Sequence, residues 1–352
     1  MLIINDLHIG VVRSGGTTPQ SQEDLRNYLR RGLKDILWEE DYEAVINGDL
    51  FDSFTVDTLE VVKTAEILYE WLYNRASGKL HLIAGNHDWN PRAGKLSSFH
   101  LLAIMLDMSD VGGRVQIYDK GFSRISDEGI WCIPHQANQE VFDAEIEKAI
   151  NQPKPTVKGE DRFLLLHCNY RNNFADNSDH SLNLSEEQVA NLMISGWSLV
   201  IGHEHIGYSL RGGRVLVVGN QFPSSVADCK GEKGKFAVKI TDEGVVPIQT
   251  WSPNGHYTEI DWRSECPERY HFIRVVGDAT AQEAAEVIKA VANMRQRSDA
   301  FVITNAVRIE GQDMTVCEES VESIRAFDVV GAIMAELDEC EQEVVKGLLN
   351  AQ

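Results

Sequence analysis

Short apolar runs alternate with longer amphipathic stretches over the first 220 residues or so of the chain. The apolar runs lie at residues 2–4, 44–46, 80–84, 163–166, 199–201 and 214–218. Runs this short, bounded by polar or glycine-containing clusters, are typical of buried strands. Helical patterns occupy residues 21–40, 58–75, 99–106, 141–150 and 185–193. Strands that alternate with helices predict a layered α/β fold.

The pattern changes after residues 251–255, a stretch that contains Pro253 and Gly255. A strand, an alanine-rich helix and a second strand are predicted at residues 271–276, 281–295 and 300–309. This small α/β unit has no polar cluster of its own. Residues 318–349 are acidic, and their pattern predicts a helix with apolar side chains near one face. We therefore expect three parts: residues 1–255, 256–311 and 312–352.

The composition is that of a soluble globular protein, with 43% hydrophobic and 25% charged residues among 352. There are 33 basic and 54 acidic residues, so the formal net charge is −21. This charge argues against a protein that holds nucleic acid or an anionic membrane by bulk electrostatics.

Cysteine usage and hydropathy indicate the compartment. The six cysteines are widely spaced and form no Cys-x-x-Cys pair, which is typical of reduced thiols in a cytosolic protein. The first residues carry no basic, apolar signal sequence, and no segment approaches the roughly 20 apolar residues of a membrane span. We expect a cytoplasmic protein that does not associate with membranes.

Five polar clusters follow the predicted strands in order. They are Asp6-x-His8, Gly48-Asp49-x-x-Asp52, Gly85-Asn86-His87-Asp88, His167, and Gly202-His203-x-His205. Each alone is ordinary turn chemistry or a core histidine, but five in succession, each after a strand, are not a coincidence. Because carboxylate, imidazole and amide donors occur without sulfur, they favour Mn²⁺, with Fe²⁺ or Zn²⁺ as alternatives. Seven candidate ligands exceed one tetrahedral site and suit two ions that share a carboxylate.

As an ordered set, these motifs resemble the calcineurin-like metallophosphoesterases over roughly residues 1–225. The resemblance implies a four-layer αββα sandwich. Within that superfamily the chain looks most like the SbcD-type DNA nuclease subunit of bacteria and large phages. The narrower likeness rests on the loop after Asn86-His87-Asp88, on the run 130–134 that ends in Ile-Pro, and on the parts after residue 256. Those parts resemble the DNA-capping domain and the ATPase-binding segment of that family.

The resemblance assigns a role to each motif residue. The first metal ion would be bound by Asp6, His8, Asp49 and His205, and the second by Asn86, His167 and His203, with Asp49 bridging. His87 would be the catalytic imidazole beside the leaving oxygen, and Asp52 the carboxylate that orients it. The cofactor implied is a pair of divalent ions, Mn²⁺ in our prediction.

The same resemblance implies metal-dependent hydrolysis of DNA phosphodiesters, as an exonuclease that can also act as an endonuclease, in DNA repair and recombination. The partners implied are DNA, an SbcC-like coiled-coil ABC ATPase and a second copy of the chain. The tail would bind the ATPase, or else pack as an amphipathic helix on its own domain. Candidate substrate contacts lie beside the motifs: Trp89, Arg92, Tyr170 and Arg171. A packed tryptophan in a solvated loop is the alternative for Trp89.

Two other functions remain open. A phosphoesterase of nucleotides or cyclic nucleotides would carry identical motifs, and only the region beyond residue 256 argues against it. A non-catalytic scaffold is disfavoured because all seven candidate ligands and His87 are present. A protein serine/threonine phosphatase is disfavoured because that branch has Arg-Gly after the second motif and Glu where this chain has Asp88.

Overall fold

The computed structural model describes residues 1–13, 18–40, 42–89, 95–126, 129–153, 162–170, 182–229, 234–241 and 244–310. The chain divides into two compact units, residues 1–312 and 313–352. The helical tail expected at residues 312–352 falls outside the described residues, so its structure and its partner remain predictions.

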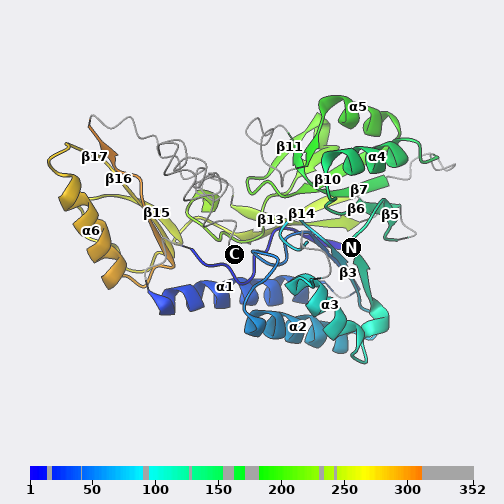
Figure 1. The fold of residues 1–352 in the computed structure, drawn as a ribbon, viewed down its shortest axis with the longest axis horizontal. Helices are drawn as coiled ribbons and strands as arrows, with labels where there is room; N and C mark the ends of the chain where they lie inside the picture. Colours follow the sequence, from blue (N-terminus) through cyan, green and yellow to red (C-terminus); the bar gives the residue numbers. More distant parts are fainter. Residues whose placement is uncertain are drawn as a thin grey trace, which may run out of the picture. The chain divides into compact units, whose positions relative to one another are not determined.

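Two six-stranded sheets form the centre of the first unit (Figure 1). The first sheet has the order β14-β13-β1-β2-β3-β4, and the second has the order β11-β12-β10-β7-β6-β5. In the first sheet the strands are β1 (Leu2–Ile4), β2 (Glu43–Asn47), β3 (Lys79–Ile83), β4 (Val115–Tyr118), β13 (Lys235–Thr241) and β14 (Gly244–Trp251). In the second they are β5 (Ser123–Arg124), β6 (Ile130–Ile133), β7 (Arg162–His167), β10 (Trp197–Gly202), β11 (Tyr208–Leu210) and β12 (Val215–Val217).

The central strands of both sheets run parallel to their neighbours. Strands β1 to β4 are parallel in the first sheet, as are β6, β7, β10 and β12 in the second. The carboxyl ends of neighbouring strands therefore share one edge of each sheet. Strands β8 (Asn169–Tyr170) and β9 (Asn183–Leu184) form a separate parallel pair.

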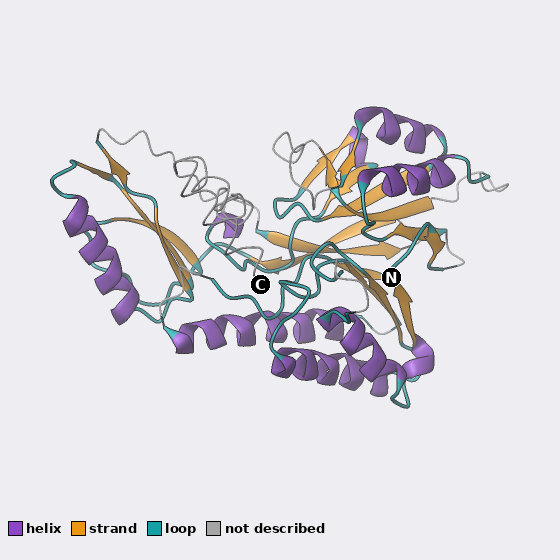
Figure 2. Ribbon diagram, viewed as in Figure 1, coloured by secondary structure: helices purple, strands orange, loops and turns teal. Residues whose placement is uncertain are grey.

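Helices cover the outer face of each sheet (Figure 2). The first sheet packs against α1 (Pro19–Trp38), α2 (Thr58–Tyr73) and α3 (Ser98–Asp107), and the second against α4 (Gln139–Ile150) and α5 (Glu186–Ile194). Short 3₁₀ turns are η1 (Gly112–Arg114), η3 (Arg211–Gly213) and η4 (Ala227–Cys229).

Alternation along the strands creates three apolar layers. Leu2 and Ile4 of β1 face the helices, whereas Ile3 packs between the sheets with residues of the second sheet such as Leu165. Successive side chains of a strand point to opposite faces, so a strand covered on both sides is apolar throughout. The predicted four-layer αββα sandwich is confirmed.

Local sequence signals decide where the helices begin. In α1, Thr18 and Ser21 form a reciprocal capping box and Pro19 occupies the first helical position. The helix therefore starts slightly before the apolar periodicity that begins at Leu25. The other predicted helices also lie within a few residues of their observed bounds, where periodicity is least informative.

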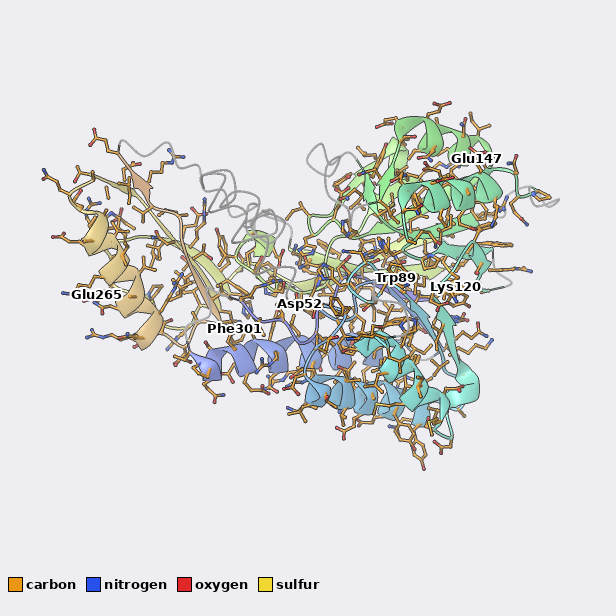
Figure 3. The ribbon with its side chains drawn as sticks, viewed as in Figure 1. Asp52, Trp89, Lys120, Glu147, Glu265 and Phe301 are labelled. Atoms are coloured by element: carbon orange, nitrogen blue, oxygen red, sulfur yellow. The ribbon has the colours of Figure 1, made fainter. Side chains whose placement is uncertain are left out.

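A smaller α/β unit follows residue 256. Its parallel sheet has the order β15 (Tyr257–Asp261), β16 (Phe272–Val276) and β18 (Val302–Asn305), and α6 (Ala284–Arg297) packs against it over a separate core. The single strand predicted at 300–309 is instead two strands, because the chain changes partner: β18 pairs with β16, and β19 (Arg308–Ile309) pairs with β17 (Asp278–Ala279). Phe301 (Figure 3) precedes β18, and its ring centroid lies 5.4 Å from that of Tyr28 of α1. The proposed domain boundaries themselves remain predictions.

Among the described residues, no helix combines the length and apolar character that crossing a bilayer requires.

Candidate active site

The polar clusters lie at the carboxyl ends of parallel strands from both sheets. Asp6 follows β1, Asp49 follows β2 and Asn86 follows β3, while His167 and His203 lie at the ends of β7 and β10. Open α/β sheets bind their ligands at this edge. The two sheets thus bring residues far apart in sequence to one place.

The backbone is strained at four of these residues. Asp6, His8, Asp49 and His203 have φ angles of 49°, 48°, 48° and 87°. Left-handed backbone is uncommon for residues other than glycine and costs free energy that the surrounding structure must offset. Such strain concentrates at functional sites, and here it coincides with predicted metal ligands.

Two glycines allow the polar side chains to come close. A Cβ atom on Gly48 would lie 2.0 Å from Nδ1 of His167, and one on Gly85 would lie 2.2 Å from Oδ1 of Asp49. The motif glycines are therefore needed for space beside the site, in addition to any role in their turns.

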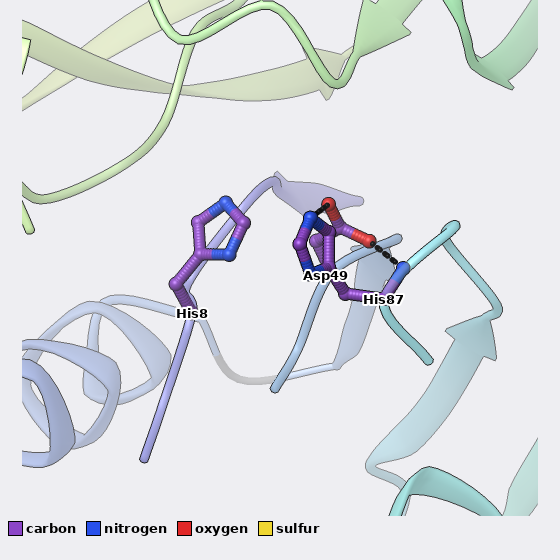
Figure 4. Close-up of side chains that lie close together, drawn as sticks. All are labelled: His8, Asp49 and His87. Atoms are coloured by element: carbon purple, nitrogen blue, oxygen red, sulfur yellow. Dashed lines mark hydrogen bonds and ion pairs between the residues drawn. The ribbon is translucent and has the colours of Figure 1, made fainter. Parts of the chain in front are cut away.

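One group of donor atoms surrounds His8. Its Nε2 lies 3.0 Å from Nε2 of His205. Donor atoms of His8, Asp49 and His87 all lie within 4.8 Å of one another (Figure 4). Both carboxylate oxygens of Asp6, a predicted ligand of the same ion as His8, accept the main-chain N–H of His203 at 3.0 Å, and its Oδ1 lies 3.9 Å from Nδ1 of His167.

A second group is centred on Asn86. Its Oδ1 lies 2.9 Å from Nε2 of His167 and 2.9 Å from Nδ1 of His203. Asp49 Oδ2 is 3.3 Å from the same Nε2 of His167. Donor atoms of Asp49, His167 and His203 again lie within 4.8 Å of one another. Asp49 belongs to both groups, as a bridging carboxylate must.

The protonation of His167 shows how well this second group suits a cation. Burial alone would lower the pKa of His167, but the carboxylates of Asp49 and Asp6 raise it to about 9. Its Nδ1 faces the main-chain carbonyl of Asn47 at 3.2 Å, so Nδ1 carries hydrogen and Nε2 points at Asp49 and Asn86. A divalent ion at this site would displace the proton from Nε2, since a metal binds the neutral imidazole.

The other pKa shifts follow the same pattern. Burial raises the pKa of Asp6 to about 6, assisted by the neighbouring charge of Asp49. Burial would also raise the pKa of Asp49, but His167 and His87 hold it well below its ordinary value. Burial and the charge of His167 lower the pKa of His203 to about 3, which keeps its imidazole neutral and able to bind a metal. A buried set of oxygen and nitrogen donors with mixed charge fits a pair of divalent ions.

A comparison with protein families matches a model described as calcineurin-like phosphoesterase to residues 1–221. The chain belongs to the calcineurin-like phosphoesterase family. Family membership implies a hydrolase of phosphoester bonds that uses divalent metal ions, and the donor groups around Asp49 are the residues of this phosphoesterase that suit such ions.

Three solved structures illustrate a distant similarity to this phosphoesterase. No curated protein sequence matches it significantly. Among solved structures, a phosphopantetheinyl hydrolase from Mycobacterium tuberculosis is 15% identical, with a TM-score of 0.33 over 62% of this chain and 89% of that one. The nuclease MPE of Pseudomonas putida is 17% identical, with a TM-score of 0.25 over 60% and 64% of the two chains. A cold-active protein-tyrosine phosphatase of a Shewanella species is 13% identical, with a TM-score of 0.35 over 71% and 77%. Similarities this weak assign no substrate to the chain.

Asp52 contacts His87 through its main chain, whereas the orienting role predicted for its carboxylate stays a prediction. Nδ1 of His87 faces the main-chain carbonyl of Asp52 at 2.7 Å, so the main chain of Asp52 holds this ring. The carboxylate of Asp52 instead lies 3.7 Å from Nδ1 of His8 and 3.4 Å from the guanidinium of Arg13. Asp52 therefore holds His87 through its backbone, while its carboxylate pairs with Arg13.

Of the predicted substrate contacts, Trp89 stays a prediction and Tyr170 is buried. Trp89 is half-buried in the loop after His87 (Figure 3). Tyr170 does not fit a groove-lining role: its side chain is in the core of the second sheet, the residue is only 1% exposed, and its hydroxyl donates to Glu186 at 3.0 Å. Arg92 and Arg171 lie outside the described residues.

Three buried charged residues of this phosphoesterase organise the site without a role predicted from the sequence. Asp88 accepts the main-chain N–H groups of Gly85, Leu50 and Phe51 at 3.0, 3.3 and 3.2 Å, which ties the second and third motif loops together. Its position inside a motif was a signal for this role. Asp228 and Lys235 contact His205, but they lie outside every motif, so no spacing pattern identifies them.

Proposed function

We propose that this chain is a metal-dependent DNA phosphodiesterase, the nuclease subunit of an SbcC–SbcD-like repair and recombination complex. The observation that carries the proposal is the pair of donor groups that share Asp49 at the carboxyl ends of strands from both sheets. Two ions joined by one carboxylate suit in-line displacement at phosphorus. The additional α/β unit at residues 257–310 supports a polymeric substrate, since this part resembles the DNA-capping domain of the SbcD-type nucleases.

Seven residues would hold the two ions: Asp6, His8, Asp49 and His205 at the first site, and Asp49, Asn86, His167 and His203 at the second. When bound, Mn²⁺ ions neutralise phosphate charge and make the attacking water more acidic. The chain's own part is to fix the donors. Main-chain contacts such as His203 N–H to Asp6 and His87 N–H to Asp49, both 3.0 Å, hold the carboxylates in place.

His87 is placed to transfer a proton at one nitrogen. A carbonyl oxygen can only accept a hydrogen bond, so Nδ1 of His87 keeps its hydrogen toward Asp52 in both charge states. The proton that comes and goes is therefore on Nε2, which lies 4.0 Å from Oδ2 of Asp49. As a general acid, His87 would protonate the departing sugar oxygen from Nε2.

The acidity of the chain is compatible with a DNA substrate if the affinity for DNA has another source. Two divalent ions carry four positive charges against the two negative charges of Asp6 and Asp49, so the loaded site is locally positive. A net charge of −21 does not supply the remaining attraction to the phosphate backbone. In the proposal, an SbcC-like ABC ATPase bound to residues 312–352, together with dimerisation of the cytoplasmic complex, provides that attraction.

One assay tests the catalytic proposal. Purified protein with Mn²⁺ is incubated with end-labelled linear DNA, with circular single-stranded DNA and with bis-p-nitrophenyl phosphate. Degradation of linear DNA that stops with EDTA and is lost in Asp49→Asn supports a nuclease, and cutting of the circle adds an endonuclease. Hydrolysis of the small diester alone would favour the small-substrate alternative. Inactivity toward all three would favour a scaffold.

The partner proposal has its own test. Deletion of residues 312–352 should abolish co-purification with the ATPase while leaving hydrolysis of bis-p-nitrophenyl phosphate intact. Association that survives this deletion would contradict the role of the tail.

A further inference from the structure

A hydrogen-bond network outside the motifs holds the imidazole of His205. Nδ1 of His205 lies 2.8 Å from Oδ1 of Asp228, while Nε2 on the other side of the ring faces Nε2 of His8 at 3.0 Å. Asp228 is only 3% exposed. A carboxylate on one ring nitrogen leaves the opposite nitrogen with its lone pair, which is the form that binds a metal ion.

The other oxygen of Asp228 is fully occupied by donors. Oδ2 accepts the main-chain N–H of Ser224 at 2.9 Å, the hydroxyl of Ser224 at 3.1 Å and the main-chain N–H of Ser225 at 2.9 Å. These bonds fix the plane and the direction of the carboxylate. Asp228 therefore cannot turn away from His205 without leaving buried donors unpaired, which is costly.

Two cations extend the network on either side. Arg13 donates to the carbonyl and hydroxyl oxygens of Ser224 at 3.2 and 2.7 Å, and its guanidinium also lies 3.4 Å from Asp52. Lys235 donates from Nζ to the main-chain carbonyl of His205 at 2.8 Å. The ring of His205 is thus held through its side chain by Asp228, and its backbone by Lys235.

We propose that Asp228 is a positioning residue of the first metal site, which fixes His205 as the tautomer with hydrogen on Nδ1 and aims its Nε2 at the ion shared with His8. This inference rests on the proposed function, because it assigns the support of one predicted ligand. The competing explanation is that Asp228 only organises the turn at residues 224–228 and that its contact with His205 has no effect on metal binding.

The variant Asp228→Asn separates these explanations. The amide has one oxygen, and the two main-chain N–H groups of Ser224 and Ser225 require that oxygen on their side. The amide NH₂ must then face His205, and because it only donates, Nδ1 must accept. The ring hydrogen then lies on Nε2. This nitrogen must lose that hydrogen before it can bind a metal. The turn at residues 224–228 is preserved, whereas His205 has its hydrogen on the nitrogen that should bind the metal.

The test uses two measurements on the full chain. Long-range ¹⁵N–¹H spectra of the metal-free protein at mildly alkaline pH report the tautomer of His205, assigned by its absence from a His205→Gln sample. Titration calorimetry with Mn²⁺ alone reports the two sites. We expect Nδ1–H in the wild type and Nε2–H in Asp228→Asn, with roughly 10- to 100-fold weaker affinity at one site and an unchanged second site.

Glu145→Gln is the matched control. Glu145 is also a buried carboxylate that accepts a main-chain N–H, from Phe122 at 2.8 Å, but it lies on α4, away from the donor groups. Its amide variant should bind Mn²⁺ at both sites like the wild type.

The outcomes distinguish the inference from the proposed function. Wild-type affinity and an Nδ1–H ring in Asp228→Asn would overturn the inference and leave the proposed function intact. An Nε2–H ring in the wild type would overturn it even if the variant failed to fold. A wild-type protein that takes up no Mn²⁺ would refute the proposed function, and the tautomer comparison would still decide whether Asp228 sets the ring.

Discussion

The Nε2 atoms of His8 and His205 face each other at 3.0 Å, although the residues are 197 positions apart. Burial and the charge of His205 hold the pKa of His8 well below its ordinary value, so this imidazole is neutral. Two imidazole nitrogens this close share at most one hydrogen, whereas a divalent ion would engage both lone pairs. The first and last motifs of the phosphoesterase part therefore meet at the atoms that a metal would join.

Metal binding should consequently stabilise the folded protein. An ion that binds only the native state adds about 2.7 kcal/mol at a concentration 100 times its Kd. We expect Mn²⁺ to raise the Tm of the wild type by several degrees and EDTA to reverse the shift, as measured by differential scanning calorimetry.

The variant Asp49→Asn should abolish that shift and the hydrolysis of bis-p-nitrophenyl phosphate, because Asp49 belongs to both donor groups. Asparagine tolerates the φ of 48° at this position, so the backbone is preserved. Asp143→Asn is the matched control: Asp143 accepts from Gln139 and Gln188, both at 2.8 Å, on the outer helices. A full Mn²⁺ shift in Asp49→Asn would contradict the bridging role.

Much of this architecture could be predicted from the sequence because the relevant signals are local. Apolar runs such as Leu2–Ile4, each followed by polar residues, identify buried strands and their functional ends. The order of strands in a sheet is not local. Periodicity predicts β18 and β19 as one strand, since only the change of pairing partner separates them.

The site shows the same division between local and long-range information. The motifs identify His205 and His87, but not which atoms orient them. Asp228 follows His205 by 23 residues on an unremarkable turn, and the carbonyl of Asp52 contacts His87 although a sequence suggests only its side chain. Tyr170 follows a motif histidine closely, yet its side chain points into the core. The direction of a side chain depends on packing against residues that are distant in the sequence. The neighbouring residues therefore do not predict it.

The variant His87→Asn should retain both metal sites and lose turnover. Loss of a general acid costs roughly 10²- to 10⁴-fold in rate. Because p-nitrophenolate departs without a proton and a sugar oxygen does not, the loss should be larger for DNA than for bis-p-nitrophenyl phosphate. Rate constants for the two substrates, with Mn²⁺ stoichiometry by calorimetry, check this. His87 lies near His8 and Asp49, so loss of one ion in the variant would instead make it a ligand.

The variant Gly85→Ala should disrupt metal binding by steric overlap of the added Cβ with Asp49. The added Cβ would lie 2.2 Å from Oδ1 and 2.4 Å from the main-chain nitrogen of Asp49, neither of which can yield cheaply. Overpacking of this kind costs about 1–3 kcal/mol. We expect a lower Tm and no Mn²⁺ uptake. Gly113→Ala, where a Cβ meets nothing within 4 Å, should leave both unchanged. Normal Mn²⁺ uptake by Gly85→Ala would show that the loop that carries Asp49 shifts to make room for the added Cβ.

The variant Tyr170→Phe distinguishes a structural from a substrate-binding tyrosine. Phenylalanine keeps the ring that packs in the core and removes only the hydroxyl that donates to Glu186 at 3.0 Å. Loss of one such hydrogen bond costs roughly 0.5–1.5 kcal/mol of unfolding free energy. We expect that decrease in urea denaturation, with kcat and KM for bis-p-nitrophenyl phosphate and for DNA unchanged. A raised KM at unchanged stability would instead mean that Tyr170 reaches the substrate, and that the loop after His167 opens to expose it.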